Sequence, residues 1–219
     1  MTPVIVWGGT GQARVLREAL GTTARIVAVF DNREIPSPFA DVPIFRGERG
    51  LEDWRASYAG PHPVTACVAI GGAHGADRLA MQRMLEVRGY PPLTVVHPRA
   101  FVAADAHLGR GCQVLAMAAV CTGARLGDAT IVNTSASVDH DCALGAGVHV
   151  GPGARLAGEV VVDDGVFIGA GAVVLPRVRI GAHATVGAGA VVTRDVPEGT
   201  TVIGTPARPH DFLQKRDDA

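Results

Sequence analysis

Residues 144–186 read LGAGVHVGPGARLAGEVVVDDGVFIGAGAVVLPRVRIGAHATV, and an aliphatic side chain recurs in them every six positions. The same spacing runs without a gap from position 102 to position 192. Four residues after each aliphatic position the side chain is again small or apolar. The aliphatic series is Val102, Leu108, Val114, Val120, Leu126, Val132, Val138, Leu144, Val150, Leu156, Val162, Ile168, Val174, Ile180, Val186 and Val192.

A period of six fits neither an α-helix of 3.6 residues per turn nor the simple alternation of a long strand. A short strand followed by a tight corner, repeated, returns an aliphatic side chain to the interior each time, and hexapeptide repeats indicate a parallel β-helix. Three hexads make one triangular coil, so positions 18 residues apart stack along the axis. Glycines at the corners are expected to supply backbone conformations that other residues resist: Gly109, Gly127, Gly145, Gly169, Gly181 and Gly187.

Residues 1–95 have a different pattern, in which strand-like and helix-like segments alternate. VIVWGG, RIVAVFDN and VTACVAIGG read as strands, and GQARVLREAL and ADRLAMQRMLEVRG as helices. Such alternation predicts a small parallel α/β unit. A glycine turn, residues 8–11, falls between a strand and the start of a helix, where free backbone N–H groups favour phosphate. Asp31 follows at the end of the next strand, where a carboxylate can accept ribose hydroxyls.

A dinucleotide site is the obvious alternative for this turn. The third glycine of the G-x-G-x-x-G pattern is missing, because Arg14 stands where a pattern starting at Gly9 requires glycine. The unit is also too short for both halves of a dinucleotide-binding domain. We therefore favour a mononucleotide or nucleotide-sugar phosphate over NAD(P), with a purely structural turn as the remaining alternative.

Composition points to a small-molecule partner. The formal net charge of −1 gives no broad electrostatic footprint for nucleic acid or an anionic membrane. No stretch approaches the roughly 20 apolar residues that span a bilayer, and no signal peptide is evident, so we expect a cytoplasmic protein. The four cysteines lack metal-ligand spacing, so we expect free thiols and no metal.

A resemblance to a known family extends over nearly the whole chain, and its specific motifs are WGGTGQARVL, VFDN, VAIGG, HPRAFVAADAHLG, IVNTSASVDHDCALG and VGAGAVVTRDVPEGTTVIGTPAR. The chain resembles the sugar acetyltransferases that include sialic-acid O-acetyltransferases and the bacillosamine- and perosamine-type nucleotide-sugar N-acetyltransferases. The resemblance implies a Rossmann-like α/β domain over residues 1–95 that holds the nucleotide sugar. It also implies an all-β left-handed parallel β-helix over residues 96–219, with a C-terminal tail. The β-helix is expected to form homotrimers that bind acetyl-CoA between neighbouring subunits.

The resemblance also implies roles for individual residues. His140 is the expected catalytic base, with Asp141 as the acidic neighbour that raises its basicity. His149, Ala170 and Ala188 are expected to contact acetyl-CoA. Members of the family often have histidine where this chain has Gln12. The expected nucleotide-sugar contacts are Gly8, Gly9, Thr10, Gly11, Gln12, Asp31, Asn32 and Gly71.

The spacing supports the assignment of His140. It follows the inward-facing Val138 by two residues and therefore occupies an outward-facing corner, with the small Gly158 one coil further on. An imidazole, whose ordinary pKa is about 6.5, can take a proton from an attacking amine or hydroxyl near neutral pH. Cys142 falls on an inward position, so direct transfer is favoured over an acyl-enzyme. His62, His74, His97, His107, His183 and His210 are expected to have surface or packing roles.

These observations predict acetyl-CoA-dependent N-acetyltransfer to a nucleotide-linked amino sugar. O-acetylation of a sialic-acid-like sugar uses the same base and is the main alternative. A non-catalytic trimeric β-helix scaffold is an alternative of another class, and a nucleotidyltransferase with an appended β-helix is weaker, since no long N-terminal domain is present.

Overall fold

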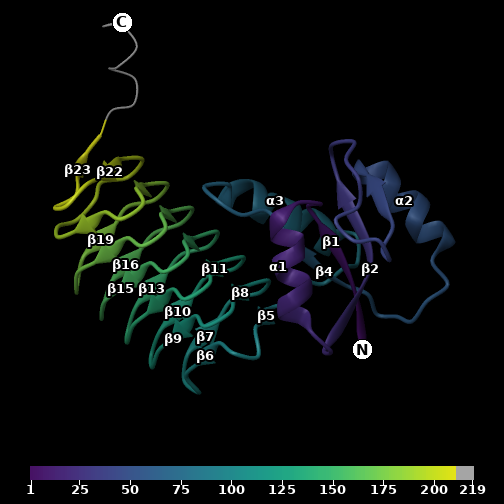
Figure 1. Cartoon of the computed structure of the whole chain (residues 1–219), viewed down its shortest axis with the longest axis horizontal. Coiled ribbons are helices and arrows are strands. Elements are labelled where there is room, and N and C mark those ends of the chain that lie inside the picture. The colour runs from purple at the N-terminus through teal and green to yellow at the C-terminus, as the bar shows by residue number, and fades with distance from the viewer. Residues whose placement is uncertain (211–219) are drawn as a thin grey trace, which may run out of the picture.

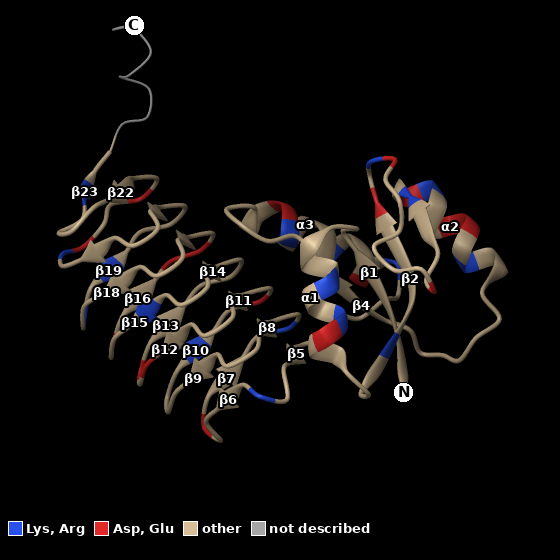
Figure 2. Ribbon diagram, viewed as in Figure 1, with Lys and Arg blue, Asp and Glu red and all other residues tan. Residues whose placement is uncertain are grey.

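The structure is a computed structural model that describes residues 1–210 of the chain; the predicted C-terminal tail extends beyond the described residues. An α/β unit and a stack of short β-strands lie end to end (Figure 1), and the amino terminus belongs to the α/β unit. Charges of both signs are scattered over the two parts (Figure 2), in keeping with the small net charge. No helix within residues 1–210 is long and apolar enough to cross a membrane.

The α/β unit contains a parallel sheet of four strands in the order β3-β2-β1-β4. Both faces of the sheet are covered, as parallel sheets require. Side chains of β1 alternate between the two sides, so that Val4 and Val6 join a cluster with Leu16 of α1, whereas Ile5 joins a cluster with Trp54 of α2. The elements are β1 (Thr2–Trp7), α1 (Gly11–Leu20), β2 (Ala24–Asp31), β3 (Ile44–Arg46), α2 (Gly47–Ser57), β4 (Thr65–Val68) and α3 (Gly75–Val87).

The expected strands and helices of this unit are confirmed, including the end of the second strand at Asp31. The strand β3 and the helix α2 were not predicted. The aromatic rings of α2 and its neighbours explain why this segment is ordered: Trp54 lies edge-on to Phe30 with ring centroids 5.8 Å apart and stacks on Tyr58 at 4.6 Å.

The second part is a parallel β-helix built from hexapeptide repeats. Its strands form three sheets, in the orders β5-β8-β11-β14-β17-β20-β22-β23, β6-β9-β12-β15-β18-β21 and β7-β10-β13-β16-β19. All strand pairs in them are parallel except β22 with β23. The strands are β5 (Val95–Val96), β6 (Phe101–Val102), β7 (His107–Leu108), β8 (Gln113–Val114), β9 (Ala119–Val120), β10 (Arg125–Leu126), β11 (Ile131–Val132), β12 (Ser137–Val138), β13 (Ala143–Leu144), β14 (His149–Val150), β15 (Arg155–Leu156), β16 (Val161–Val162), β17 (Phe167–Ile168), β18 (Val173–Val174), β19 (Arg179–Ile180), β20 (Thr185–Val186), β21 (Val191–Val192), β22 (Thr201–Ile203) and β23 (Arg208–Pro209).

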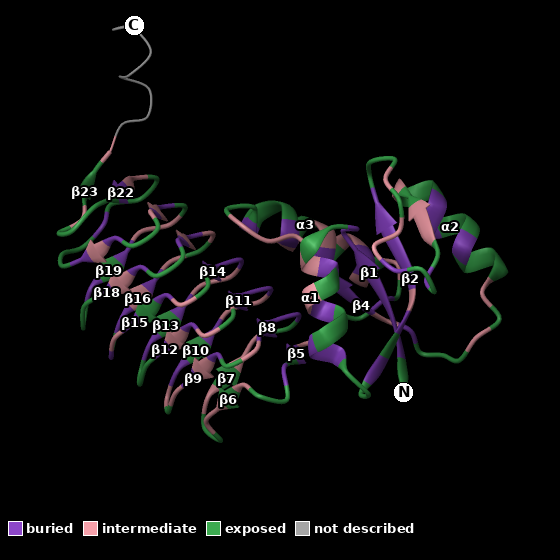
Figure 3. Ribbon diagram, viewed as in Figure 1, coloured by how far each residue is buried: buried purple, intermediate pink, exposed green. Residues whose placement is uncertain are grey.

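The 18-residue coil is confirmed by the register, in which Val132 of β11 pairs with Val150 of β14. The second residue of each hexad strand from Val114 to Val192 is buried (Figure 3) and belongs to one core along the axis, and Cys142 lies in that core as expected. The two positions nearest the start, Val102 and Leu108, pack against this core while only partly buried.

The reason proposed for the six corner glycines was wrong. None of them has a left-handed φ; instead the next coil passes too close for a side chain. A Cβ on Gly127 would lie 2.5 Å from the Ala146 nitrogen, and a Cβ on Gly169 would lie 2.5 Å from the Ala188 nitrogen. The left-handed corner positions are held by other residues, such as Gly153 (φ 68°) and Ser135 (φ 57°).

A buried arginine joins the two parts. Arg78 of α3 is fully buried and donates from Nε to the Ala129 carbonyl (2.7 Å), from one terminal nitrogen to the Ile70 carbonyl (2.9 Å) and from the other to the Gly147 carbonyl (2.7 Å). Burial lowers its pKa to about 10, so the guanidinium stays charged at neutral pH. With the Val148 carbonyl, 3.3 Å from the second terminal nitrogen, these partners satisfy a cation that would be costly to bury alone.

Candidate active site

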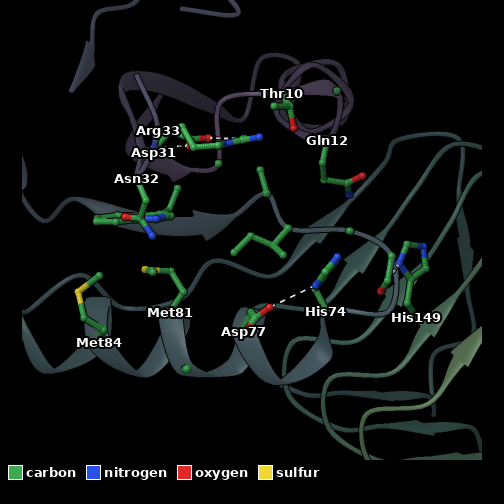
Figure 4. Close-up of a pocket in the computed structure, with 18 of the residues that line it drawn as sticks. Thr10, Gln12, Asp31, Asn32, Arg33, His74, Asp77, Met81, Met84 and His149 are labelled. Carbon is green, nitrogen blue, oxygen red and sulfur yellow. Dashed lines mark hydrogen bonds and ion pairs between the residues drawn. The ribbon is translucent and has the colours of Figure 1, made fainter. Parts of the chain in front are cut away.

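A cleft of about 1000 Å³ lies within the α/β unit and reaches the β-helix at His149. It is bounded on one side by the glycine turn and the end of β2, and on the other side by α3 (Figure 4). His149 of β14 closes one end of this cleft, and Asn32 lies toward the other. This volume is at the upper end of the range for small-molecule sites.

The cleft brings together most of the expected nucleotide-sugar residues. Those that line it are Gly8, Thr10, Gly11, Gln12, Asp31, Asn32 and Gly71, and His149 lines it with them. Gly9 is not among the lining residues, but its N–H donates to Asp31 Oδ2 at 2.9 Å, and it therefore fixes the turn to β2.

The glycine turn is shaped by backbone contacts. Gly8 has φ 109°, and a Cβ there would lie 2.5 Å from the Ala69 carbonyl oxygen, so only glycine fits. A Cβ on Gly11, in contrast, would meet nothing within 4 Å. The helix α1 begins at Gly11 and its N-terminal end lines the cleft, where N–H groups and the helix dipole favour an anion.

Asp31 has partners that the sequence did not predict. Its Oδ1 accepts from Arg33 Nε (2.9 Å) and the Arg33 N–H (3.0 Å), and its Oδ2 accepts from Gly9 and an Arg33 terminal nitrogen (3.0 Å). The Arg33 hydrogen bonds hold the pKa of this carboxyl down at about 2. Both oxygens are therefore engaged, and a ribose hydroxyl bound by Asp31 has to share or displace Arg33. Arg33 itself lines the cleft and brings a cation to it.

His149 is almost fully buried, and its ring nitrogens have defined roles. Nδ1 lies 3.3 Å from the Gly72 carbonyl, which can only accept, so Nδ1 carries the proton. Nε2 lies 3.0 Å from Asn133 Nδ2, and the other end of that amide is fixed because Oδ1 accepts the Thr134 N–H at 2.7 Å. Nε2 is therefore an acceptor. A hydrogen bond from His149 to a bound acetyl-CoA would therefore require the ring to exchange one of these partners.

The surroundings of His149 keep it neutral. Burial, and then the nearby Arg78 cation, lower its pKa to about 4. The side of the ring is covered by Phe167, whose ring lies edge-on with centroids 5.5 Å apart. Across the physiological pH range His149 is an uncharged imidazole at the end of the cleft.

His140 and Asp141 form the expected pair, outside this cleft. His140 Nδ1 lies 2.9 Å from Asp141 Oδ2, and this hydrogen bond raises the pKa of His140. Both side chains are exposed. The pair lies at the corner between β12 and β13, whereas His149 lies on the sheet that contains β14. The ring of His140 fills the space beside Gly158, where a Cβ would lie 2.2 Å from Nε2. Within one chain, the His140–Asp141 pair therefore lies apart from the cleft.

Ala170 and Ala188 occupy the corner between the sheets of β14 and β12, on successive coils. The Gly189 N–H donates to the Ala170 carbonyl at 2.9 Å, which fixes the two corners one above the other. Both alanines are exposed. The backbone of successive coils, which has small side chains at Ala170 and Ala188, is therefore accessible along this corner of the β-helix.

Three further residues of the site were missed. Arg33 and Asn133 have the contacts described above, and His74, assigned only a surface or packing role, lines the cleft with Nδ1 3.2 Å from Asp77 Oδ2. The available signals were the two-residue spacing of Arg33 from Asp31 and the 16-residue spacing of Asn133 from His149, close to one coil. Within residues 1–210 no cluster of His, Cys, Asp and Glu could hold a metal ion.

Comparison with known proteins agrees with this architecture. The family model for the bacterial transferase hexapeptide (six repeats) matches residues 159–194. No curated protein sequence matches the chain. Among solved structures, a histidine-to-asparagine variant of perosamine N-acetyltransferase from Caulobacter crescentus, in complex with CoA and GDP-perosamine, is 35% identical, with a TM-score of 0.88 over 96% of this chain and 98% of that chain.

Two further structures are similar over nearly their whole length. The acetyltransferase domain of PglB from Neisseria gonorrhoeae, in complex with acetyl coenzyme A, is 35% identical, with a TM-score of 0.84 over 95% of this chain and 98% of that chain. WeeI from Acinetobacter baumannii is 27% identical, with a TM-score of 0.77 over 96% of this chain and 100% of that chain. With this identity and coverage, the chain belongs to the hexapeptide-repeat family of CoA-dependent sugar acetyltransferases.

Proposed function

We propose that this protein transfers the acetyl group of acetyl-CoA to the amine of a nucleotide-linked 4-amino-deoxy sugar. The observation that carries the proposal is the cleft, which joins the glycine turn and the start of α1 to His149 of the hexapeptide coil. An anionic nucleotide fits the first end and a sugar extends toward the second. The relative from Caulobacter crescentus binds CoA and GDP-perosamine, a nucleotide-linked amino sugar, and shares this architecture.

The two parts of the chain have different roles. Residues 1–95 act as a Rossmann-like domain for the nucleotide sugar, with phosphate near Gly8, Gly9, Thr10 and Gly11 and the nucleoside near Asp31 and Asn32. Residues 96–219 act as the acetyltransferase domain, a left-handed β-helix with its C-terminal tail. The exposed edge at Ala170 and Ala188 supports a site for the extended arm of acetyl-CoA, because backbone groups there are not covered by long side chains.

His140 is the proposed general base. The amine attacks the thioester carbonyl carbon, a new C–N bond forms, the C–S bond breaks, and the amine proton passes to Nε2 of His140 while CoA leaves as the thiol or thiolate. Asp141, bound at Nδ1, orients the ring and stabilises the imidazolium, as a carboxylate does in a catalytic triad. Cys142 is a poor nucleophile because burial raises its thiol pKa to about 11. Transfer is therefore direct.

We infer a homotrimer, and the separation of the two histidines supports it. If His140 acts on a sugar in the cleft beside His149, it has to come from a neighbouring subunit, because the two lie on different faces of one coil. A closed ring of three identical subunits repeats such a shared site at each interface.

A panel of acceptors tests the proposal. We expect CoA release from acetyl-CoA with at least one of GDP-perosamine and the UDP- and dTDP-linked 4-amino sugars, and no release with the matched nucleotide sugars that carry a hydroxyl in place of the amine. Acetylation of the hydroxyl sugars or of a sialic acid would favour O-acetyltransfer instead. Absence of CoA release with every acceptor would favour the non-catalytic scaffold.

A further inference from the structure

A chain of two glutamine amides crosses from the β-helix to the cleft. Gln113 of β8 is buried, and its Nε2 donates to the Val68 carbonyl at 2.8 Å. Its Oε1 accepts from Nε2 of Gln12, the second residue of α1, at 2.7 Å. The two residues are 101 positions apart and come from different parts of the fold.

The direction of this chain is fixed at its buried end. The Val68 carbonyl can only accept, so Gln113 must present its NH₂ group there and its oxygen toward Gln12. Gln12 must then direct its NH₂ group at Gln113. The remaining atom, Oε1 of Gln12, is left as a hydrogen-bond acceptor. Its orientation is set by the Val68 carbonyl through the Gln113 amide.

This acceptor is open to the cleft. Within residues 1–210, every buried side-chain oxygen or nitrogen has a hydrogen-bond partner. Oε1 of Gln12 has no partner among these residues, so this atom is not buried. Gln12 lines the cleft, and Figure 4 places it on the side toward His149, away from Asn32. A Cβ on Gly71 would lie 3.6 Å both from this oxygen and from Cε1 of His149, so both approach the same glycine.

We propose that Gln12 is a specificity residue whose Oε1 accepts a hydrogen bond from a donor of the sugar beside His149, and that Gln113 positions it. This inference rests on the proposed function and names the sugar-selecting contact within it. An amine or hydroxyl can meet this oxygen, whereas a group that only accepts, such as a keto oxygen, cannot. The amide does not titrate, so the contact is insensitive to pH.

The test compares variants at the two ends of the amide chain. Gln12→Met keeps the length and helix propensity of the side chain but removes both polar atoms. We expect kcat/KM for the amino-sugar nucleotide to fall about tenfold or more, because a substrate donor is left unpaired. KM for acetyl-CoA should be unchanged. The probes are GDP-perosamine and the UDP- and dTDP-linked 4-amino sugars at saturating acetyl-CoA.

A double-mutant cycle separates positioning from folding. Gln113→Met should lower kcat/KM less than Gln12→Met, since the Gln12 amide is then free to turn, and should have no further effect in the Gln12→Met background. Gln82→Met is the matched control: Gln82 is also buried and also bridges the two parts, through the Arg110 carbonyl at 3.1 Å, but lies outside the cleft. It should leave kcat/KM unchanged.

A histidine variant tests the acceptor itself. Gln12→His can accept only while its imidazole is neutral, so its kcat/KM relative to wild type should decline as the pH falls from about 8 to about 6. A pH-independent ratio, a Gln12→Met variant as active as wild type, or equal losses from Gln113→Met in both backgrounds would each overturn the inference while leaving the proposed function intact. Absence of turnover by the wild type with every probe would overturn both.

Discussion

At the scale of single residues, the base assignment depends on the exposed imidazole of His140, which packs against nothing in the core. We expect His140→Ala to fold and assemble normally yet to lose at least about 10²-fold in kcat, the usual size of a general-base contribution. Steady-state kinetics and size-exclusion chromatography on the same sample check the two halves of this prediction. A variant with wild-type kcat would show that another group takes the proton.

The pH dependence follows from the pair formed by His140 and Asp141. The hydrogen bond that His140 donates to Asp141 raises the pKa of His140, so a base that must be neutral becomes active only above the ordinary histidine range. We expect kcat/KM to rise with pH through an apparent pKa above about 6.5, and Asp141→Asn to move that limb to lower pH while reducing the rate. His149, with its pKa near 4, should add no limb in this range. A limb that stays in place in Asp141→Asn would exclude His140 as the titrating group.

The sequence could predict this pair because the two residues are adjacent and an outward corner follows from the repeat. It could not predict that Arg33 occupies both oxygens of Asp31, since that depends on how the loop after β2 turns back. The contact of Asn133 with His149 joins two coils. It could not be predicted either, because the buried aliphatic positions define the repeat but do not show which outward-facing side chains touch.

At the scale of elements, the coil corners contain two kinds of glycine, which differ in what an alanine would encounter. We expect Gly127→Ala to destabilise the β-helix strongly, because its Cβ would lie 2.5 Å from backbone atoms of the next coil. Gly153→Ala should cost only about 1–2 kcal/mol, the penalty of a left-handed conformation with open space around it. Thermal or denaturant unfolding of both variants measures the difference. A larger loss of stability in Gly153→Ala than in Gly127→Ala would show that backbone conformation is the main reason for glycine at these corners.

The repeat predicted the register of every coil, because one face of each strand is buried and a shift by one residue would turn the aliphatic side chains outward. The segment between β2 and β4 was not predicted. The three residues of β3 are too few to show a strand pattern, and α2 is stabilised by aromatic contacts with distant elements.

At the scale of the whole molecule, the α/β unit and the β-helix share a buried apolar cluster, to which Leu115 and Ile131 contribute, and polar contacts link them as well. Arg78 links α3 to two coils, and His97 beside the first coil approaches Glu18 of α1 with Nε2 2.7 Å from Oε1. The sequence suggested two parts and their ligands but not these contacts, since Arg78 belongs to no motif and the motif that begins at His97 does not show that its ring meets Glu18. They hold the cleft at the junction, where both parts contribute to one site.

The shared site of the proposed trimer can be tested by mixing two inactive variants. Gly11→Glu places a carboxylate at the start of α1, where the helix dipole tolerates it and no atom lies within 4 Å of the new Cβ, but where it repels a nucleotide diphosphate. His140→Ala keeps the cleft and removes the base. Each homotrimer should be inactive for a different reason. If the cleft of one subunit works with His140 of its neighbour, each mixed trimer contains one working site of three, so the isolated mixed trimers regain about a third of the wild-type activity. Co-expression with two affinity tags isolates the mixed trimers for assay. A mixture without activity would place the cleft and its base in the same subunit.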